Sequence, residues 1–269
     1  MAATARRRRR RTIADPPAMS RLILLLVAAL KFGKLAPTVL SMLLAVGVYA
    51  LAFGWRYAVG IVAMLLIHEM GHYAAARRRG LKVRLPMFIP FAFAWTTLED
   101  VPHDAETEAY IGLAGPMLGT VGAIGAWWLA QSYDARWLLA VAYTGFFINL
   151  INMIPLPPLD GGRITTVLSP RIWLLGVPII GALLWFQFSL ILLLIAILAV
   201  PHVIAAFRFD PNSSAEAQRY HDVSPRTRWE YGLIYVGLIA FLAYMTNDLH
   251  RELRGVRGQD IEQTQSSDV

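Results

Sequence analysis

The sequence predicts an all-α polytopic membrane protein with six or seven transmembrane helices. Its composition is one reason: hydrophobic residues make up 57% of the 269-residue chain, charged residues only 16%, and the mean hydropathy is +0.49. A soluble domain carries about one quarter charged residues. The other reason is that the apolar residues form long uninterrupted runs separated by short polar connections. Together these observations exclude an ordinary soluble enzyme.

The apolar runs give the order of the elements. Runs long enough to cross a hydrocarbon core about 30 Å thick lie at 35–54, 57–77, 108–130, 137–153, 188–207 and 229–246. Residues 172–187 form a less certain seventh span. Residues 22–30 are too short to cross, so we expect them to lie in the membrane interface.

Five parts of the chain follow from this pattern. We expect a basic N-terminal tail with an interfacial apolar segment, a transmembrane core, a polar loop, a final transmembrane helix and a polar, loose C-terminal tail, with boundaries at 1–34, 35–207, 208–228, 229–246 and 247–269. The connections leave no room for a sizeable soluble domain.

The net charge of +7 arises from basic residues that flank the apolar runs. Cations concentrate on the cytoplasmic side of membrane proteins, so we expect a cytoplasmic N-terminus and no nucleic-acid partner. Alanine- and arginine-rich usage favours a prokaryotic cell membrane. The chain has no cysteine, which excludes disulfides and leaves the redox compartment open. The flanking cations are Lys31, Lys34, Arg77, Arg78, Arg79, Lys82 and Arg84.

The run 57–77 ends in three arginines followed by Gly80, a pattern typical of a helix terminus. Prolines 86 and 90 then interrupt residues 81–100, whose β-branched and aromatic content predicts a membrane-associated strand or re-entrant segment rather than a spanning helix. Five glycines in the next run indicate close helix packing; they are Gly112, Gly115, Gly119, Gly122 and Gly125.

Two histidines and a glutamate lie inside the oily run 57–77. His68 and His72 are four residues apart, so they share one face of a helix and can both bind one zinc ion. Glu69 lies beside the first ligand, where it can take a proton from a water molecule; this HExxH pattern is typical of zinc metalloproteases. Ionisable groups at bilayer depth are costly unless they serve such a site. A hydrogen-bonded polar cluster is the less favoured alternative.

A catalytic zinc site requires a third protein ligand. Asp160 is the candidate, because it follows a run of prolines in "NMIPLPPLDGGR" that forbids continued helix. By spacing alone, Asp160 is equally well explained as a turn residue before two glycines. Asn149 and Asn152 share a helical face before this break and can donate amide hydrogen bonds into a cavity.

Three segments in order resemble the site-2 protease family of intramembrane zinc metalloproteases: "HEMGH", then "AGPMLG", then "NMIPLPPLDGGR". The resemblance covers about residues 57–168. It implies one Zn²⁺ ion held by His68, His72 and Asp160, with Glu69 as the catalytic glutamate. It also matches Asn152 to an asparagine near the substrate carbonyl, a substrate or oxyanion role.

The expected function is therefore hydrolysis of peptide bonds in or near transmembrane segments, in regulated intramembrane proteolysis or in turnover of membrane proteins and signal peptides. The partners would be a transmembrane protein or peptide substrate and membrane lipid; the pattern leaves the oligomeric state open. We expect residues 81–100 to offer a strand edge to the unwound substrate, so that prolines along 83–89 reduce cleavage. The alternative is an intramembrane metal or proton transporter, because buried ionisable residues also mark ion pathways.

Overall fold

The computed structural model describes residue 33, residues 35–90 and residues 93–267. The interfacial segment expected at 22–30 lies outside the described residues, as does almost all of the basic tail expected at 1–34.

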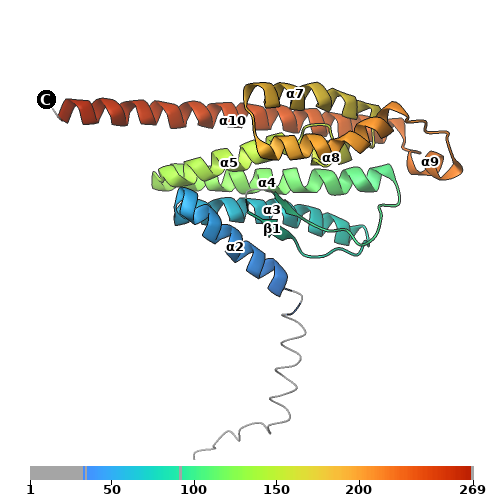
Figure 1. Cartoon of the computed structure of the whole chain (residues 1–269), viewed down its shortest axis with the longest axis horizontal. Coiled ribbons are helices and arrows are strands. Elements are labelled where there is room, and N and C mark those ends of the chain that lie inside the picture. Colours follow the sequence, from blue (N-terminus) through green and yellow to red (C-terminus); the bar gives the residue numbers. More distant parts are fainter. Residues whose placement is uncertain (1–32, 34, 91–92, 268–269) are drawn as a thin grey trace, which may run out of the picture.

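The described chain is almost entirely helical (Figure 1), which confirms the all-α membrane fold. The strands are β1 (Met87–Ile89) and β2 (Phe93–Trp95). The helices, with one 3₁₀ turn η1, are α2 (Ala36–Phe53), α3 (Trp55–Arg78), α4 (Ala105–Tyr133), α5 (Arg136–Asn152), α6 (Asp160–Thr165), η1 (Pro170–Leu175), α7 (Gly176–Phe186), α8 (Leu190–Phe207), α9 (Ala215–Tyr220) and α10 (Pro225–Ser267).

Five helices in the described part of the chain are long and apolar enough to cross a membrane: α2, α3, α4, α8 and α10 over Pro225–Gly255. The run expected to span at 137–153 forms α5, which has 17 residues and is about 25 Å long at 1.5 Å per residue. The less certain seventh span forms η1 followed directly by the 11-residue α7, together the shorter apolar helix Pro170–Phe186. Neither piece is long enough to cross a bilayer alone.

The expected helix terminus after residue 77 is confirmed. Helix α3 ends at Arg78, and Gly80 follows with φ +78°, a left-handed conformation that glycine adopts without steric cost. Helix α4 begins where the Asp104 carboxylate accepts a hydrogen bond from the Thr107 backbone N–H at 2.6 Å.

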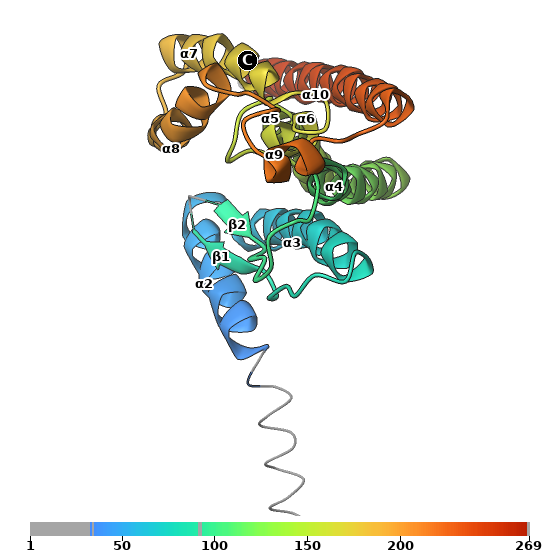
Figure 2. The same ribbon diagram turned by 90° about the vertical axis from the view of Figure 1, so that its right-hand side faces the viewer.

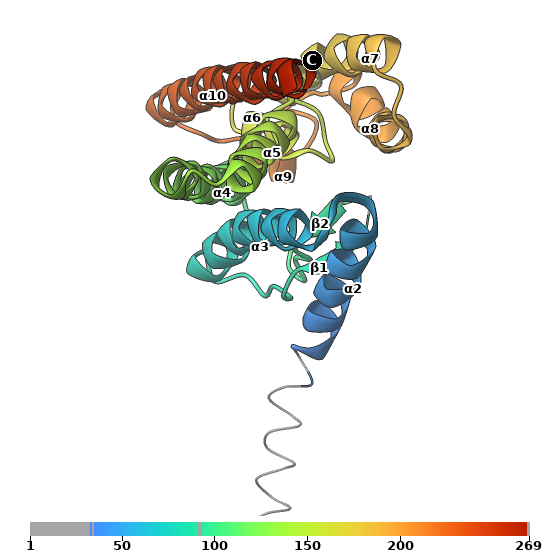
Figure 3. The same ribbon diagram turned by 90° about the vertical axis from the view of Figure 1, so that its left-hand side faces the viewer.

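Helices α3, α4 and α5 occupy the middle of the bundle, and α2 and the α7–α8 pair lie at its periphery (Figure 3). The expected close packing of the glycine-rich run is confirmed. At Gly71 of α3 a Cβ atom would lie 2.2 Å from the Ala114 carbonyl oxygen of α4, and at Gly122 of α4 it would lie 3.0 Å from Ile67 of α3. Small residues allow the two backbones to approach this closely.

The segment after α3 forms the expected strand structure, a short antiparallel hairpin in which Phe88 lies opposite Ala94. β1 lies on the α2 side of the hairpin (Figure 2). The Phe88 backbone N–H donates to the Ser41 hydroxyl of α2 at 3.2 Å, so it points away from β2. Phe88 and Ala94 therefore form a non-hydrogen-bonded pair, and the peptide groups of Ala94 point away from β1.

Beyond α8, the polar loop expected at 208–228 contains the short helix α9. The Tyr220 hydroxyl at the end of α9 donates to Glu108 in the first turn of α4. Burial and the adjacent Glu108 carboxylate raise the pKa of Tyr220, so its hydroxyl stays a donor. Helix α10 starts at Pro225 and continues to Ser267. The residues expected to form a loose tail from 247 are thus helical, because they extend a helix already begun in the membrane.

Candidate metal centre

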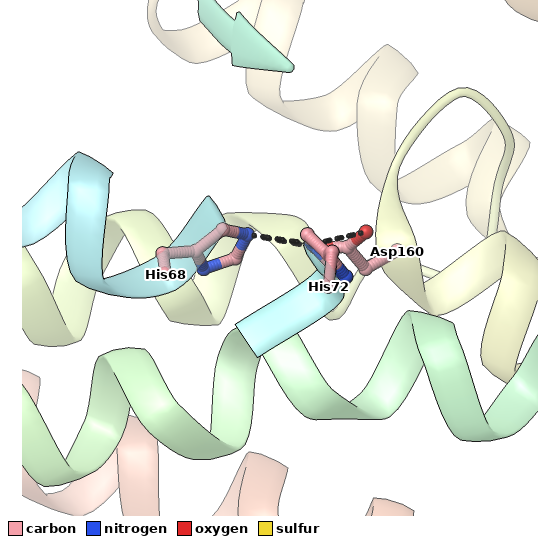
Figure 4. Close-up of side chains that lie close together, drawn as sticks. All are labelled: His68, His72 and Asp160. Atoms are coloured by element: carbon pink, nitrogen blue, oxygen red, sulfur yellow. Dashed lines mark hydrogen bonds and ion pairs between the residues drawn. The ribbon is translucent and has the colours of Figure 1, made fainter. Parts of the chain in front are cut away.

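His68 and His72 lie one turn apart on α3, and Asp160 is the first residue of α6 (Figure 4). The His68 Nε2 atom is 3.1 Å from Asp160 Oδ2, and the His72 Nε2 atom is 3.2 Å from Asp160 Oδ1. The two Nε2 atoms are 3.1 Å apart. All three side chains are buried. The structure thus brings the three candidate ligands together although Asp160 is far from the histidines in sequence.

The broken helix places Asp160 at this depth. Helix α5 ends at Asn152, and the chain folds back over Met153–Leu159 before α6 begins. A Cβ atom at Gly161 would lie 2.3 Å from the Met153 carbonyl oxygen, and one at Gly162 would lie 2.2 Å from the Pro157 nitrogen. The two glycines are therefore required by close backbone approach, not by a surface turn. Of the two explanations that the sequence left open for Asp160, the buried position beside the histidines favours the ligand.

Hydrogen bonds fix the orientation and the tautomer of both histidines. The His72 Nδ1 atom lies 2.8 Å from the Ile111 carbonyl oxygen, which can only accept. The His68 Nδ1 atom lies 2.8 Å from Asn149 Oδ1. The Asn149 amide nitrogen donates to the Gly145 carbonyl oxygen at 2.8 Å, so its oxygen is the atom that faces His68. Both Nδ1 atoms therefore carry a proton, so that each ring in its neutral form presents a bare Nε2 atom.

Three hydrogen-bond acceptors consequently converge with no donor among them: two bare Nε2 atoms and one carboxylate. Such a cluster is repulsive and costly when buried unless a cation or extra protons balance it. Ligand atoms about 2.0–2.1 Å from a tetrahedral zinc ion are about 3.3 Å apart. The observed separations of 3.1–3.2 Å match one face of that tetrahedron, so the donor set fits zinc and leaves the fourth position open.

Glu69 is buried beside the cluster but does not belong to it, because the group able to hold one ion consists of His68, His72 and Asp160. The Glu69 Oε2 atom accepts a hydrogen bond from the Thr96 hydroxyl at 2.8 Å. Glu69 thus lies beside the candidate ligands, where the HExxH pattern predicts a base.

Other carboxylates and histidines are occupied elsewhere. Asp104 caps α4, Glu106 pairs with Arg79 at 3.2 Å, and Glu108 accepts from Tyr220. Asp100 accepts from the Lys82 backbone N–H at 2.8 Å. His202 of α8 lies against the Trp173 ring, and His103 is exposed.

The two asparagines of α5 have different positions. The sequence predicts that both face a polar cavity, and the structure connects Asn149 directly to a ligand histidine. The Asn152 amide nitrogen instead donates to the Ile148 carbonyl oxygen of its own helix at 3.0 Å. Sequence reasoning missed two further groups, Thr96 and the Ile111 carbonyl, because neither belongs to a motif. A polar residue directly after the strand was the signal available for Thr96.

The sequence model of Peptidase family M50 matches residues 56–134, which include α3, the hairpin and α4. This part of the chain is similar to peptidase family M50, the site-2 protease family. The match contains His68, Glu69 and His72 and ends before Asp160, so Asp160 is a candidate ligand on its geometry and not on the family match. The family resemblance stated from the motifs is thereby confirmed.

Curated relatives agree with this assignment. A zinc metalloprotease of Methanocaldococcus jannaschii is 29% identical over 142 residues, covering 51% of this chain and 41% of that protein. Stage IV sporulation protein FB of Bacillus subtilis is 26% identical over 113 residues, covering 41% and 39%. A probable chloroplastic zinc metalloprotease of Arabidopsis thaliana is 37% identical over 67 residues, covering 23% and 12%. The chain thus aligns with less than half of the length of each relative.

Proposed function

We propose that this integral membrane protein is a zinc metalloendopeptidase that hydrolyses peptide bonds in or near the transmembrane segments of other proteins. The observation that carries the proposal is the convergence of three buried acceptors, His68 Nε2, His72 Nε2 and Asp160, with Glu69 alongside. The family match and the relatives named as zinc metalloproteases support the same chemistry. No specific observation favours the transporter alternative.

Each residue has a distinct role in this proposal. His68, His72 and Asp160 would hold the Zn²⁺ ion, which supplies an electrophile for the carbonyl and acidifies a water molecule. Glu69 would accept a proton from the attacking water as its oxygen bonds to the carbonyl carbon, and would deliver that proton to the amine that leaves when the C–N bond breaks. Asn149 keeps His68 in the tautomer with a bare Nε2 atom. Asn152 remains the candidate for a hydrogen bond to the developing oxyanion.

The substrate is expected to bind as a strand, because the carbonyls of a helix are hydrogen-bonded and screened. Of the two edges of the hairpin, the outer edge of β2 is the better one for a substrate strand to pair with, and we call it the receiving edge. Helix α2 covers the outer edge of β1, where the Phe88 N–H is already bonded to Ser41. The peptide groups of Ala94 point outward on the other edge, the edge that leads to Thr96 and Glu69. An unwound substrate segment pairing there would lie next to the candidate base.

Cleavage assays on paired variants test the activity. Asp160→Ala should lose stoichiometric zinc and cleavage, whereas Glu69→Gln should retain zinc and lose cleavage, because Glu69 is not a ligand. Membrane-fraction proteomics of cells carrying Glu69→Gln should show accumulated single-span fragments. Asp100→Ala is the matched control, since Asp100 lies in the connection between β2 and α4, accepts from the Lys82 backbone N–H and does not belong to the group able to hold an ion. Persisting cleavage in Glu69→Gln would reject the proposal.

Proline substitution tests the receiving edge. The prolines expected from sequence to act along 83–89 belong on β2 instead. Ala94→Pro removes an N–H that takes no part in the hairpin ladder, and proline is tolerated at such edge positions. It should reduce cleavage while zinc content stays unchanged. If Ala94→Pro cleaves like the wild type, substrate pairing on β2 is wrong.

The setting of the site in the cell is also part of the proposal. The cations at the end of α3, Arg77 and Arg78, support a cytoplasmic location for that end and for the N-terminus. The exposed apolar faces of α2 and α8 support lipid as their surroundings. The prokaryotic origin rests on composition. Labelling of single introduced cysteines from either side of the membrane tests the topology, and the natural absence of cysteine keeps that experiment free of background.

A further inference from the structure

The Thr96 side chain is in direct contact with Glu69, the candidate base. Its hydroxyl donates to Glu69 Oε2 at 2.8 Å and lies 3.2 Å from the Glu69 backbone carbonyl oxygen. Twenty-seven residues separate the two in sequence. In the described part of the chain, Thr96 is the side chain that donates to the Glu69 carboxylate. The hydroxyl therefore fixes one carboxylate oxygen and leaves the other for the reacting water.

The backbone of Thr96 lies on the receiving edge. The Arg84 N–H donates to the Thr97 carbonyl and the Glu99 N–H to the Lys82 carbonyl, both at 2.9 Å, so residues 97 and 99 direct their peptide groups inward. Because peptide groups alternate along a strand, those of Thr96 point outward, as those of Ala94 do. One residue thus presents its backbone to an incoming strand and its hydroxyl to Glu69.

We propose that Thr96 is a positioning residue that aligns the Glu69 carboxylate and couples this alignment to substrate pairing on β2. A substrate strand that pairs beside Thr96 holds the loop after β2 in place. Because the Thr96 hydroxyl is hydrogen-bonded to Glu69, the fixed loop also fixes the orientation of the Glu69 carboxylate. This inference rests on the proposed protease function. It assigns to the hairpin a part in chemistry as well as in substrate binding.

Three variants test the role by activity. Thr96→Val preserves shape and the β-branched backbone preference but removes the donor, and it should lower kcat about tenfold with KM and zinc content unchanged. Thr96→Ser keeps the hydroxyl and should restore most of kcat. Thr97→Val makes the same change at the exposed neighbouring threonine and should leave kcat intact. A purely structural role would move KM or zinc content instead.

A spectroscopic measurement tests the hydrogen bond without activity. In protein labelled with ¹³C-carboxyl glutamate, the infrared difference between wild type and Glu69→Gln isolates the Glu69 carboxylate band. Thr96→Val should shift this band, and Thr96→Ser should not. A shifted band together with absent proteolysis in the wild type would refute the proposed function but not the contact. An unshifted band, an unchanged kcat in Thr96→Val, or an equal loss in Thr97→Val would overturn the positioning role.

Discussion

The inner helices α3 and α4 are more buried but less apolar than the peripheral helices α2 and α8. In soluble proteins the relation is the opposite, because the most apolar parts are the most buried. In α3 and α4, 44% and 56% of the membrane-length window is buried inside the protein, against 11% in α2 and 17% in α8. Yet α8 is the most apolar of these helices and α3 the least. The most hydrophobic helix therefore faces outward, and the helix with ionisable residues lies inside.

The difference follows from the solvent. Lipid tails are as apolar as leucine, so burying a leucine inside a membrane protein gains little transfer free energy. Two kinds of residue gain more from burial: polar groups that need a hydrogen-bond partner, and small residues that allow two helices to approach closely. His68, His72 and Glu69 of α3 are such polar groups, and Gly115 of α4 is a small residue that allows His72 to approach closely. Substitutions in the inner helices should therefore damage the site, and those in the outer helices should be tolerated.

The largest effect is expected at Gly115 of α4. A Cβ atom there would lie 2.2 Å from His72 Nε2, and the His72 ring cannot retreat without losing its bond to the Ile111 carbonyl. Gly115→Ala should therefore weaken zinc binding by more than about 100-fold, beyond the loss of about 10- to 100-fold that removal of a supporting hydrogen-bond partner causes, and abolish cleavage at limiting zinc. Zinc titration with a competing chelator measures the loss.

Gly125 of the same helix provides the control, because a Cβ atom there meets nothing within 4 Å. Gly125→Ala should bind zinc like the wild type. Equal zinc affinity in the two variants would contradict the view that the α4 glycines are fitted to the metal ligands.

A smaller and more selective effect is expected at the two asparagines of α5. Asn149→Leu removes the acceptor that orients His68 and should lower zinc affinity about 10- to 100-fold. Asn152→Leu leaves the ligands untouched, and if Asn152 stabilises an oxyanion it should lower kcat at full zinc occupancy. Measuring zinc affinity and kcat separately distinguishes the two roles. A loss of zinc in Asn152→Leu would place that residue with the metal instead.

The sequence predicted those parts of the site that depend on local spacing. Two histidines four apart must share a helical face, and the break after Asn152 follows from the prolines. The ligand role of Asp160 was undecided by spacing, because only the tertiary fold brings α6 against α3. Thr96 and the Ile111 carbonyl were missed for the same reason. Both act through contacts between different helices or strands. A backbone carbonyl is common to every residue, so no sequence motif indicates which one is used.

The membrane-spanning helices were predicted well where the length of the apolar run determines the helix. They were predicted less well where contacts or polar composition determine it. The seventh run contains enough apolar residues, but it begins within the 3₁₀ helix η1, which continues into α7 with helical backbone angles at Leu175 and Gly176. A Cβ atom at Gly176 would lie 2.6 Å from the Leu156 Cβ atom, so this junction packs against the loop that leads to Asp160. Hydropathy does not record such a contact. The helical extension of α10 past residue 247 was missed, because a polar composition is also typical of an unstructured tail.

The smallest effect is expected within α8, where two aliphatic residues of equal size on the same helix differ in what surrounds them. Ile195 is buried against the cluster that includes Leu156 and Ile180, whereas Leu198 is 43% exposed. In water Ile→Ala in a core costs about 2–5 kcal/mol, part of which is the transfer of apolar atoms. In a bilayer the cavity remains but the transfer contribution largely disappears. Ile195→Ala should therefore destabilise by about 1–2 kcal/mol and Leu198→Ala by less than about 0.5 kcal/mol, with zinc content unchanged in both. Unfolding in mixed micelles measures the difference, and equal losses would mean that α8 faces protein on both sides rather than lipid on one.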